Sequence, residues 1–406
     1  MKWIDGGITA PKGYKAAGFA AGIKKKKKDI ALVISDSQAV VAGAFTTNMV
    51  KAAPVLWDQQ IVASNEPVKA IVINSGNANA CTGEQGMLDA AKMAETTAKA
   101  LNCQDTEVLV CSTGVIGVLL PMDKIVSGID NCASLLDTTN EAAYDAAWAI
   151  CTTDTFVKQV AVELDIGGHT VKIGGMAKGS GMIHPNMATM LSFITTDAEI
   201  DKGLLQDLLG DSIAESYNMI SVDGDTSTND TVIVLANGCS GAPRITSGSD
   251  YEKLFADAFG AVHAELAKLI VKDGEGAGKF IQVEIEGAAS VEDARLMARS
   301  VISSNLVKAA FFGADANWGR ILCAMGYAKA QLDPSSVSMD YSSPVGTIAV
   351  LKHGLPLVFD EDVAKKILNE KEIVVHAVVG TGIGKATAWG CDLTYEYVRI
   401  NGDYRS

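Results

Sequence analysis

The stretch from Lys178 to Leu191 reads K-G-S-G-M-I-H-P-N-M-A-T-M-L and brings a hydroxyl group to the start of an apolar segment. Met190 to Ile194 form a short apolar run bounded by Thr195 and Thr196, which predicts a buried strand. Thr189 is therefore expected where a glycine-containing loop enters a strand. Its hydroxyl could act as a nucleophile, but β-branched residues favour strands, so the pattern alone favours a structural role.

A second hydroxyl of interest follows the apolar run Val108–Cys111, which is predicted as a strand and continues into C-S-T-G-V-I-G. A strand that ends at Thr113 and Gly114 presents backbone N–H groups and a hydroxyl at the edge of the sheet. Such a turn can bind a developing oxyanion. Most Thr-Gly pairs are ordinary turns, so the pattern leaves both interpretations open.

The sequence does not indicate a metal or nucleotide site. His184 beside Pro185 is interpreted as a loop histidine satisfied by the backbone, and none of the five histidines stands in a metal-ligand spacing. Ser221–Thr231 begins like a calcium loop but lacks the terminal glutamate and flanking helix of an EF-hand. No phosphate-binding glycine motif is found in the sequence. We therefore expect no metal and no resident cofactor.

Composition restricts the class of protein further. The 406 residues are 48% apolar and 20% charged, which is typical of a globular protein, and the net charge of −14 argues against nucleic acid or an anionic membrane as partner. The eight scattered cysteines form no C-x-x-C pair, and we find no signal peptide and no membrane-spanning run, so we expect a cytoplasmic protein. The five lysines of Lys24–Lys28 are interpreted as a solvated turn between two strands.

Apolar periodicity predicts long helices and short strands that occur in blocks. Helices are predicted at 84–101, 140–150, 202–220, 251–272 and 291–301. Strands are predicted at 30–34, 68–73, 108–111, 160–164, 171–173, 190–194, 232–236 and 280–285. Gly6–Gly18 is predicted as a loop, and Gly167–Thr170 as the turn of a hairpin. Because the elements do not alternate as βαβ units, an α+β layered sandwich is favoured over a doubly wound sheet.

With these motifs in place, the chain closely resembles the ornithine acetyltransferase family, the ArgJ-type glutamate N-acetyltransferases of arginine biosynthesis. The similarity includes M-A-T-M-L and extends from G-G-I-T-A-P-K-G near the N-terminus to N-G-D-Y-R-S at the end. It implies an α/β/β/α sandwich of the self-cleaving, N-terminal-nucleophile type.

The resemblance implies that the chain cuts itself between Ala188 and Thr189. An alpha fragment, 1–188, and a beta fragment, 189–406, would then form one intertwined unit. The new N-terminal threonine would carry a nucleophilic hydroxyl and an α-amine that accepts its proton, with a pKa of roughly 7.7–8.0. An internal threonine has no such amine, so cleavage would create the site. The flexible Gly179 and Gly181 suit the strained backbone that cleavage needs.

The resemblance also implies roles for individual residues. Thr113 and Gly114 match the oxyanion-stabilising pair, the threonine through its side chain and the glycine through its backbone. The substrate-contacting positions match Thr152, Lys178, Thr189, Glu275, Asn401 and Ser406. Lys178 suits a substrate carboxylate and Glu275 the side-chain ammonium of ornithine, although alone each would be interpreted as a solvated surface charge. Two departures from the family pattern are Gly278, in place of threonine, and Gly402, in place of alanine. The first is expected to loosen the Glu275 loop.

The resulting hypothesis is a glutamate N-acetyltransferase that carries acetyl from N2-acetylornithine to glutamate through an acetyl-Thr189 intermediate, with ping-pong kinetics. Some relatives also use acetyl-CoA as donor, and the sequence does not distinguish the two cases. The family suggests a heterotetramer of two alpha and two beta fragments. The alternatives are a self-processed aminopeptidase of the related fold and an uncleaved, non-catalytic protein that binds small molecules.

Overall fold

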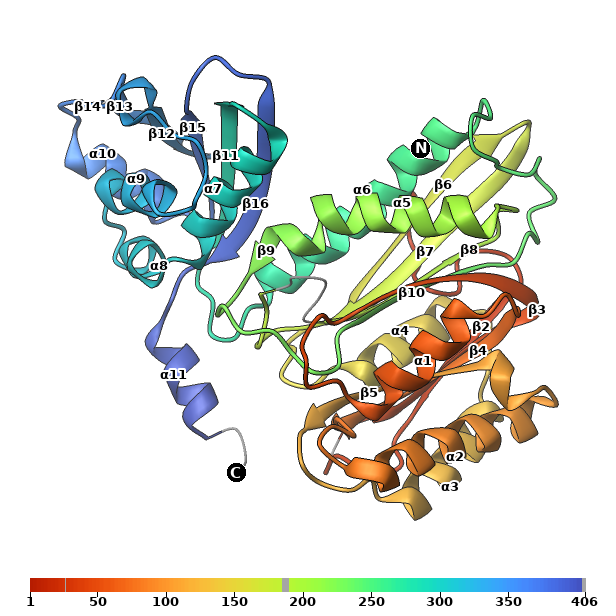
Figure 1. Ribbon diagram of the computed structural model, residues 1–406. Helices are drawn as coiled ribbons and strands as arrows, with labels where there is room; N and C mark the ends of the chain where they lie inside the picture. The colour runs from red at the N-terminus through yellow and green to blue at the C-terminus, as the bar shows by residue number, and fades with distance from the viewer. Residues whose placement is uncertain (26, 185–189, 404–406) are drawn as a thin grey trace. The chain divides into compact units, whose positions relative to one another are not determined.

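The computed structural model describes residues 1–25, 27–184 and 190–403, and Figure 1 shows its helices and strands. The chain divides into two compact units. The first consists of Met1–Gly179, Asn186–Ala214 and Thr226–Leu266, and the second of Ser180–Pro185, Glu215–Asp225 and Ala267–Ser406. Each unit therefore contains residues from both sides of the predicted cut.

In the described part of the first unit, nine strands form one mixed sheet. The spatial order is β1-β6-β7-β8-β10-β3-β4-β5, with β2 paired to β3. β8 lies between an antiparallel β7 and a parallel β10, and β4 runs parallel to β5. The strands are Lys2–Ile4 (β1), Tyr14–Phe19 (β2), Ile30–Phe45 (β3), Val68–Asn77 (β4), Val108–Val115 (β5), Lys158–Ile166 (β6), His169–Lys178 (β7), Leu191–Thr196 (β8) and Thr231–Ala236 (β10).

Helices cover both faces of the β3-β4-β5 part of this sheet. Alternate residues such as Val33 and Ile71 pack in one apolar cluster with α4, while Leu32 and Val72 pack in another with α2 and α3, which lie side by side (Figure 1). Burial on both faces explains why these strands are continuous apolar runs. The helices that begin in this unit are Ala53–Ala63 (α1), Gly83–Leu101 (α2), Met122–Ala133 (α3), Asn140–Ile150 (α4), Lys202–Glu215 (α5) and Glu252–Lys272 (α6).

The second unit has its own mixed sheet, in the order β14-β13-β12-β15-β11-β16-β9, and α7 packs on β11 and β16. Its strands are Ile220–Ser221 (β9), Phe280–Ala288 (β11), Ser338–Ser343 (β12), Gly346–Lys352 (β13), Leu355–Pro356 (β14), Glu372–Val378 (β15) and Gly384–Cys391 (β16). Its helices are Val291–Ser303 (α7), Asn305–Phe312 (α8), Trp318–Gly326 (α9), Glu361–Leu368 (α10) and Tyr395–Gly402 (α11).

These elements confirm the α+β prediction, and the helix 140–150 and the β6–β7 hairpin lie where they were expected. Some element predictions were wrong. The loop predicted at Gly6–Gly18 becomes strand β2 from Tyr14 onward, and a Cβ on Gly18 would lie 2.1 Å from the Asp145 carbonyl oxygen of α4. That glycine therefore serves close packing rather than a turn. The strand predicted to end at Cys111 continues to Val115, and the helix predicted to Ile220 ends at Glu215.

Candidate active site

The predicted oxyanion pair, Thr113 and Gly114, lies near the end of strand β5. Instead of leaving the sheet, Thr113 and Gly114 remain paired with β4, where Gly114 lies opposite Gly76. Gly114 has a φ of +134°, and a Cβ at this position would lie 2.3 Å from the Gly76 carbonyl carbon. The backbone conformation therefore requires glycine here. Thr113 is half-buried.

The end of strand β7 brings a second predicted residue to the same place. The ammonium of Lys178 donates a hydrogen bond of 3.4 Å to the Thr113 hydroxyl oxygen, although the two residues lie 65 positions apart. Lys178 is 9% exposed. The solvated surface lysine that its residue type alone would suggest is therefore not what the structure contains.

A buried ion pair that the sequence did not reveal lies beside Lys178. The Lys158 ammonium donates to Asp154 at 2.7 Å, and both side chains are 0% exposed. Asp154 also accepts the backbone N–H groups of Thr152 and Gly179, each at 2.9 Å. Burial alone would raise the pKa of Asp154, but Lys178 and Lys158 outweigh it and hold that pKa well below its usual range. Thr152 and the end of β7 are thus joined through one carboxylate.

The Lys24–Lys28 run lies between β2 and β3 as predicted, but the interpretation as a solvated turn was wrong for its inward-facing members. Lys24 donates to the carbonyl oxygen of Cys151 at 2.8 Å, and Lys27 donates to that of Thr152 at 3.4 Å. Burial lowers the pKa of Lys24 to about 8. These lysines bind the carbonyls after the C-terminus of α4, where helices favour cations.

In the second unit, the structure brings Glu275 and Asn401 together. The Asn401 side-chain amide donates to the Glu275 carboxylate at 2.8 Å, although Asn401 itself is exposed on α11. Glu275 is 7% exposed, and its backbone N–H donates to the Ser180 carbonyl oxygen. A Cβ on Gly181 would lie 2.3 Å from the Glu275 carboxyl group, so the glycine leaves room for that side chain.

The two departures from the family pattern have different surroundings. The N–H of Gly278 donates to Asp392 at 2.8 Å, and a Cβ there would lie 3.1 Å from the same carboxylate. A Cβ on Gly402 would have no atom within 4 Å. The expectation that Gly278 loosens the Glu275 loop stays a prediction. Ala188, Thr189 and Ser406 lie outside the described residues.

The segment that precedes the predicted cut is bound by Asp223. This carboxylate accepts the backbone N–H groups of Met182 and Ile183 at 2.6 and 2.8 Å, and the Tyr397 hydroxyl donates to it at 3.2 Å. Met182 has a φ of +56°, which side chains rarely adopt, so the carboxylate stabilises a strained backbone.

His184 lies in the same segment, and its ring contacts side chains of its own unit. Its Nδ1 lies 3.1 Å from the Ser221 hydroxyl, and its Nε2 lies 3.4 Å from the Arg299 guanidinium. Burial and the charge of Arg299 lower the pKa of His184. The ring is therefore held between polar side chains of its own unit.

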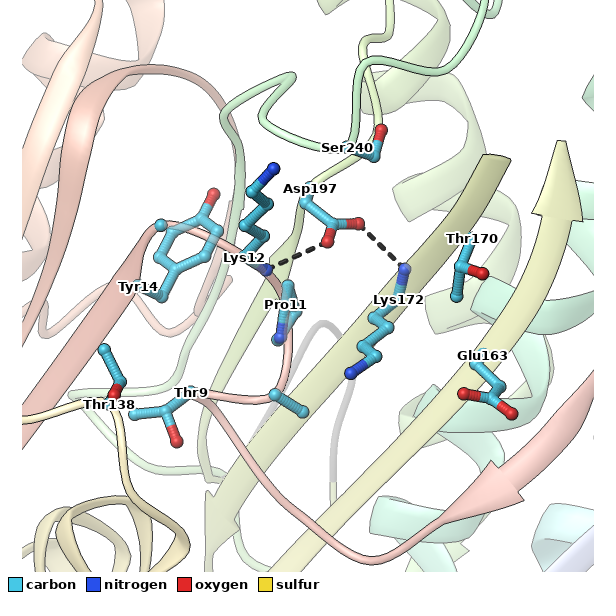
Figure 2. Close-up of a pocket in the computed structure, with 12 residues that line it drawn as sticks. Thr9, Pro11, Lys12, Tyr14, Thr138, Glu163, Thr170, Lys172, Asp197 and Ser240 are labelled. Carbon is cyan, nitrogen blue, oxygen red and sulfur yellow. Dashed lines mark hydrogen bonds between the residues drawn. The ribbon is translucent and has the colours of Figure 1, made fainter. Parts of the chain in front are cut away.

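A separate cavity of about 630 Å³ opens in the first unit, at the end of β7 opposite to Lys178 (Figure 2). Asp197 accepts the backbone N–H groups of Lys12 and Lys172 there, at 2.9 and 2.8 Å, and burial raises its pKa. The carboxylate thereby attaches the N-terminal loop to β7. The lining residues are Thr9, Ala10, Pro11, Lys12, Gly13, Tyr14, Thr138, Glu163, Thr170, Lys172, Asp197 and Ser240, which include none of the predicted site residues.

Among the described residues, no group of three or more His, Cys, Asp and Glu side chains is placed to hold a metal ion. No helix in the described ranges is long and apolar enough to cross a membrane.

Comparison with known proteins gives the family. The pattern of the ArgJ family matches residues 15–406. The arginine biosynthesis bifunctional protein ArgJ of Symbiobacterium thermophilum is 55% identical over 409 residues, and that of Caldanaerobacter subterraneus subsp. tengcongensis is 51% identical over 406; both matches cover 100% of each chain. The crystal structure of ornithine acetyltransferase complexed with ornithine from Mycobacterium tuberculosis is 44% identical over 46% of this chain and 99% of that one, with a TM-score of 0.42. The family match and the identities to the two full-length relatives confirm the predicted resemblance, and the chain belongs to the ArgJ family.

Proposed function

We propose that this chain is a self-processed glutamate N-acetyltransferase that moves acetyl from N2-acetylornithine to glutamate through an acetyl-Thr189 intermediate. As an ArgJ family member it is an acyltransferase of arginine biosynthesis. The observation that carries the finer proposal is the end of β5. There Gly114 has a backbone that only glycine adopts easily, and the Thr113 hydroxyl contacts the Lys178 ammonium.

The proposed chemistry begins with maturation. The Thr189 hydroxyl attacks the Ala188 carbonyl, the acyl group moves from nitrogen to oxygen, and water releases residues 1–188. The free α-amine of Thr189 then takes the hydroxyl proton while the oxygen attacks the acetyl carbon of N-acetylornithine. Thr113 and the Gly114 N–H stabilise the oxyanion, and ornithine leaves as the amine. Glutamate attacks the acetyl-enzyme in the second half-reaction.

One pocket must accept ornithine and glutamate in turn, because acetyl is stored at a single covalent site. Both amino acids carry an α-amino and an α-carboxylate group, and they differ in side-chain charge. We assign the shared carboxylate to Lys178 and the ornithine ammonium to Glu275, with Thr152, Asn401 and Ser406 as further contacts. The hydrogen bond from Asn401 supports this role for Glu275, since it orients the carboxylate.

Intact-mass analysis of the purified protein tests the proposal. We expect fragments 1–188 and 189–406, and one uncut chain for Thr189→Ala. Incubation with N-acetylornithine alone should add one acetyl group to the fragment that begins at Thr189. Steady-state rates at several fixed glutamate concentrations should give parallel double-reciprocal lines. An uncut wild type would contradict self-processing, and intersecting lines without an acetylated fragment would exclude the covalent route.

The relatives are named bifunctional, and we propose acetyl-CoA as a second donor for this chain. Release of free CoA from acetyl-CoA and glutamate would support it, and its absence in a preparation that is active with N-acetylornithine would refute it. We further propose two copies of each fragment, which native mass spectrometry measures, and a cytoplasmic location. Hydrolysis of peptides in place of acetyl transfer would favour the aminopeptidase alternative.

A further inference from the structure

The Thr113 hydroxyl has a donor-only neighbour. An ammonium has three N–H donors and no acceptor, so in the contact with Lys178 the threonine oxygen must accept. A hydroxyl has one proton, and the positive charge of Lys178 directs that proton away from itself. Across the described part of the chain, no acceptor is found for the Thr113 proton. The contact therefore leaves this proton available to a ligand.

The neighbouring residues of β5 are held firmly. The Ser112 hydroxyl donates to the Asn74 side chain at 2.5 Å, and the Asn229 side chain donates to the Ser112 carbonyl oxygen at 2.9 Å. The Val110 N–H donates to the buried Asp58 carboxylate at 2.7 Å. The position of Thr113 is thus fixed by the strand, and its neighbour decides the direction of its hydroxyl.

The backbone beside Lys178 is also held in place. The N–H of Gly179, which follows Lys178, donates to Asp154, and Asp154 is locked by Lys158 inside the unit. The same carboxylate fixes Thr152. A distance of 3.4 Å between Lys178 and Thr113 is long for a hydrogen bond, as catalytic contacts in unliganded structures often are.

We infer that Lys178 is a positioning residue for the oxyanion donor: at the end of a strand whose backbone is anchored by the Asp154–Lys158 pair, its ammonium orients the Thr113 hydroxyl so that the proton points toward the oxyanion. This inference rests on the proposed function. When the nucleophile oxygen bonds to the acetyl carbon, the carbonyl electron pair moves to its oxygen, and Thr113 donates to that oxygen. On collapse the carbon–nitrogen bond breaks, and ornithine leaves with the proton lost by the nucleophile.

Polarisation strengthens the effect. A hydroxyl whose oxygen accepts a charge-assisted hydrogen bond becomes a stronger donor through its own proton. Lys178 has two further N–H groups, so contact with Thr113 leaves donors for a substrate carboxylate. The two roles separate kinetically, because substrate binding affects KM, whereas orientation of the oxyanion donor affects kcat.

A double-mutant cycle on kcat tests the inference, with rates normalised to the cleaved fraction measured by mass. Thr113→Val should slow transfer roughly 10²–10³-fold. Lys178→Met should slow it about 10- to 100-fold in the wild type, the loss expected for one charge-assisted hydrogen bond, but less than about twofold in Thr113→Val. Lys178→Arg, also donor only, should retain more activity than Lys178→Met. Lys172→Met, on the same strand but far from Thr113, should leave kcat unchanged.

The inference would be overturned if Lys178→Met lowered kcat by the same factor in the wild type and in Thr113→Val. It would also be overturned if Lys178→Met changed KM alone. Urea unfolding of the wild type, Thr113→Val, Lys178→Met and the double variant gives a second cycle that needs no activity. If the wild type transfers no acetyl group, the proposed function is refuted. The contact between Lys178 and Thr113 is then tested by the unfolding cycle alone. Additive unfolding effects would overturn it, and coupling of the two residues would support it.

Discussion

Removing the Lys158 ammonium should reveal how strongly the buried pair holds the site. Lys158→Met leaves a methylene chain of similar length but deprives Asp154 of a partner at 2.7 Å, in a place where both side chains are 0% exposed. Breaking a buried pair by removing one member costs about 3–5 kcal/mol. Asp154 keeps the N–H groups of Thr152 and Gly179 and the nearby charge of Lys178, so we expect the lower end, about 3 kcal/mol.

The measurement is urea unfolding in a Thr189→Ala background, which keeps the chain in one piece. The matched variant is Lys158→Met with Asp154→Asn, which removes both charges at similar volume and should recover most of the loss. Asp154→Asn alone leaves the Lys158 ammonium buried without its carboxylate, and should lower the free energy of unfolding as much as Lys158→Met does. The reasoning about this pair is wrong if the free energy of unfolding of Lys158→Met lies within about 0.5 kcal/mol of its parent. It is also wrong if the double variant recovers none of the lost stability.

The same pair gives the sign of a pH effect. The pKa of Asp154 is depressed in the folded protein, so its stabilising contribution is complete above the pKa of the unfolded chain and is lost as pH falls through the folded value. Lys158→Met removes one of the charges that depress this pKa, while the burial that raises it remains. Acid unfolding followed by circular dichroism should therefore begin at a higher pH in the variant than in its parent.

Three further predictions concern other places in the chain. Gly114→Ala would place a Cβ 2.3 Å from Gly76. It should lower kcat by at least the roughly 10²–10³-fold expected for loss of one oxyanion donor. An unchanged circular dichroism spectrum would show that the fold is retained. Asp223→Asn weakens the hydrogen bonds to Met182 and Ile183 and should slow self-cleavage in a time course by intact mass; an unchanged rate would exclude this role. Burial lowers the pKa of His263 to about 3. Between about pH 6.5 and 3 the imidazole is therefore protonated in the unfolded chain but neutral in the folded one. This group should then lower the folding stability by about 4 kcal/mol between pH 7 and 3, and His263→Leu should flatten that part of the stability profile.

The sequence predicted elements well where both faces of a segment are buried or where the turn chemistry is plain. Asn140–Ile150 has regular apolar spacing, and the Thr139 side chain caps it by accepting the Ala142 N–H. Element ends were less predictable, because pairing can continue through residues that favour turns. Gly114 is typical of a turn, yet it stays paired in the sheet opposite Gly76, with a φ of +134°.

Within the site, the chemistry of single residues was visible but their mutual contacts were not. Asp154 and Lys158 lie four positions apart outside any helix, a spacing that predicts no contact, and only the burial of β6 turns them into a pair. The signal available was a lysine that opens the strand K-Q-V-A-V-E-L, where an unpaired charge would be costly. Likewise, Lys24 and Lys27 look solvated in a run of lysines, but carbonyl oxygens after the end of α4 accept their hydrogen bonds.

The arrangement of the first unit would let one lysine, Lys178, serve both of the purposes proposed for it. A substrate carboxylate needs a fixed cation, and a hydroxyl that donates to an oxyanion needs its lone pairs engaged by something that cannot accept. An ammonium satisfies both demands, because its three N–H groups point in different directions from one charge. A neutral donor such as asparagine would orient Thr113 without binding the carboxylate as firmly. The buried Asp154 carboxylate anchors the backbone at the end of β7, next to Lys178, through the Gly179 N–H. In the proposed mechanism, the buried charge pair and the hydrogen bond between Lys178 and Thr113 are therefore parts of one connected network.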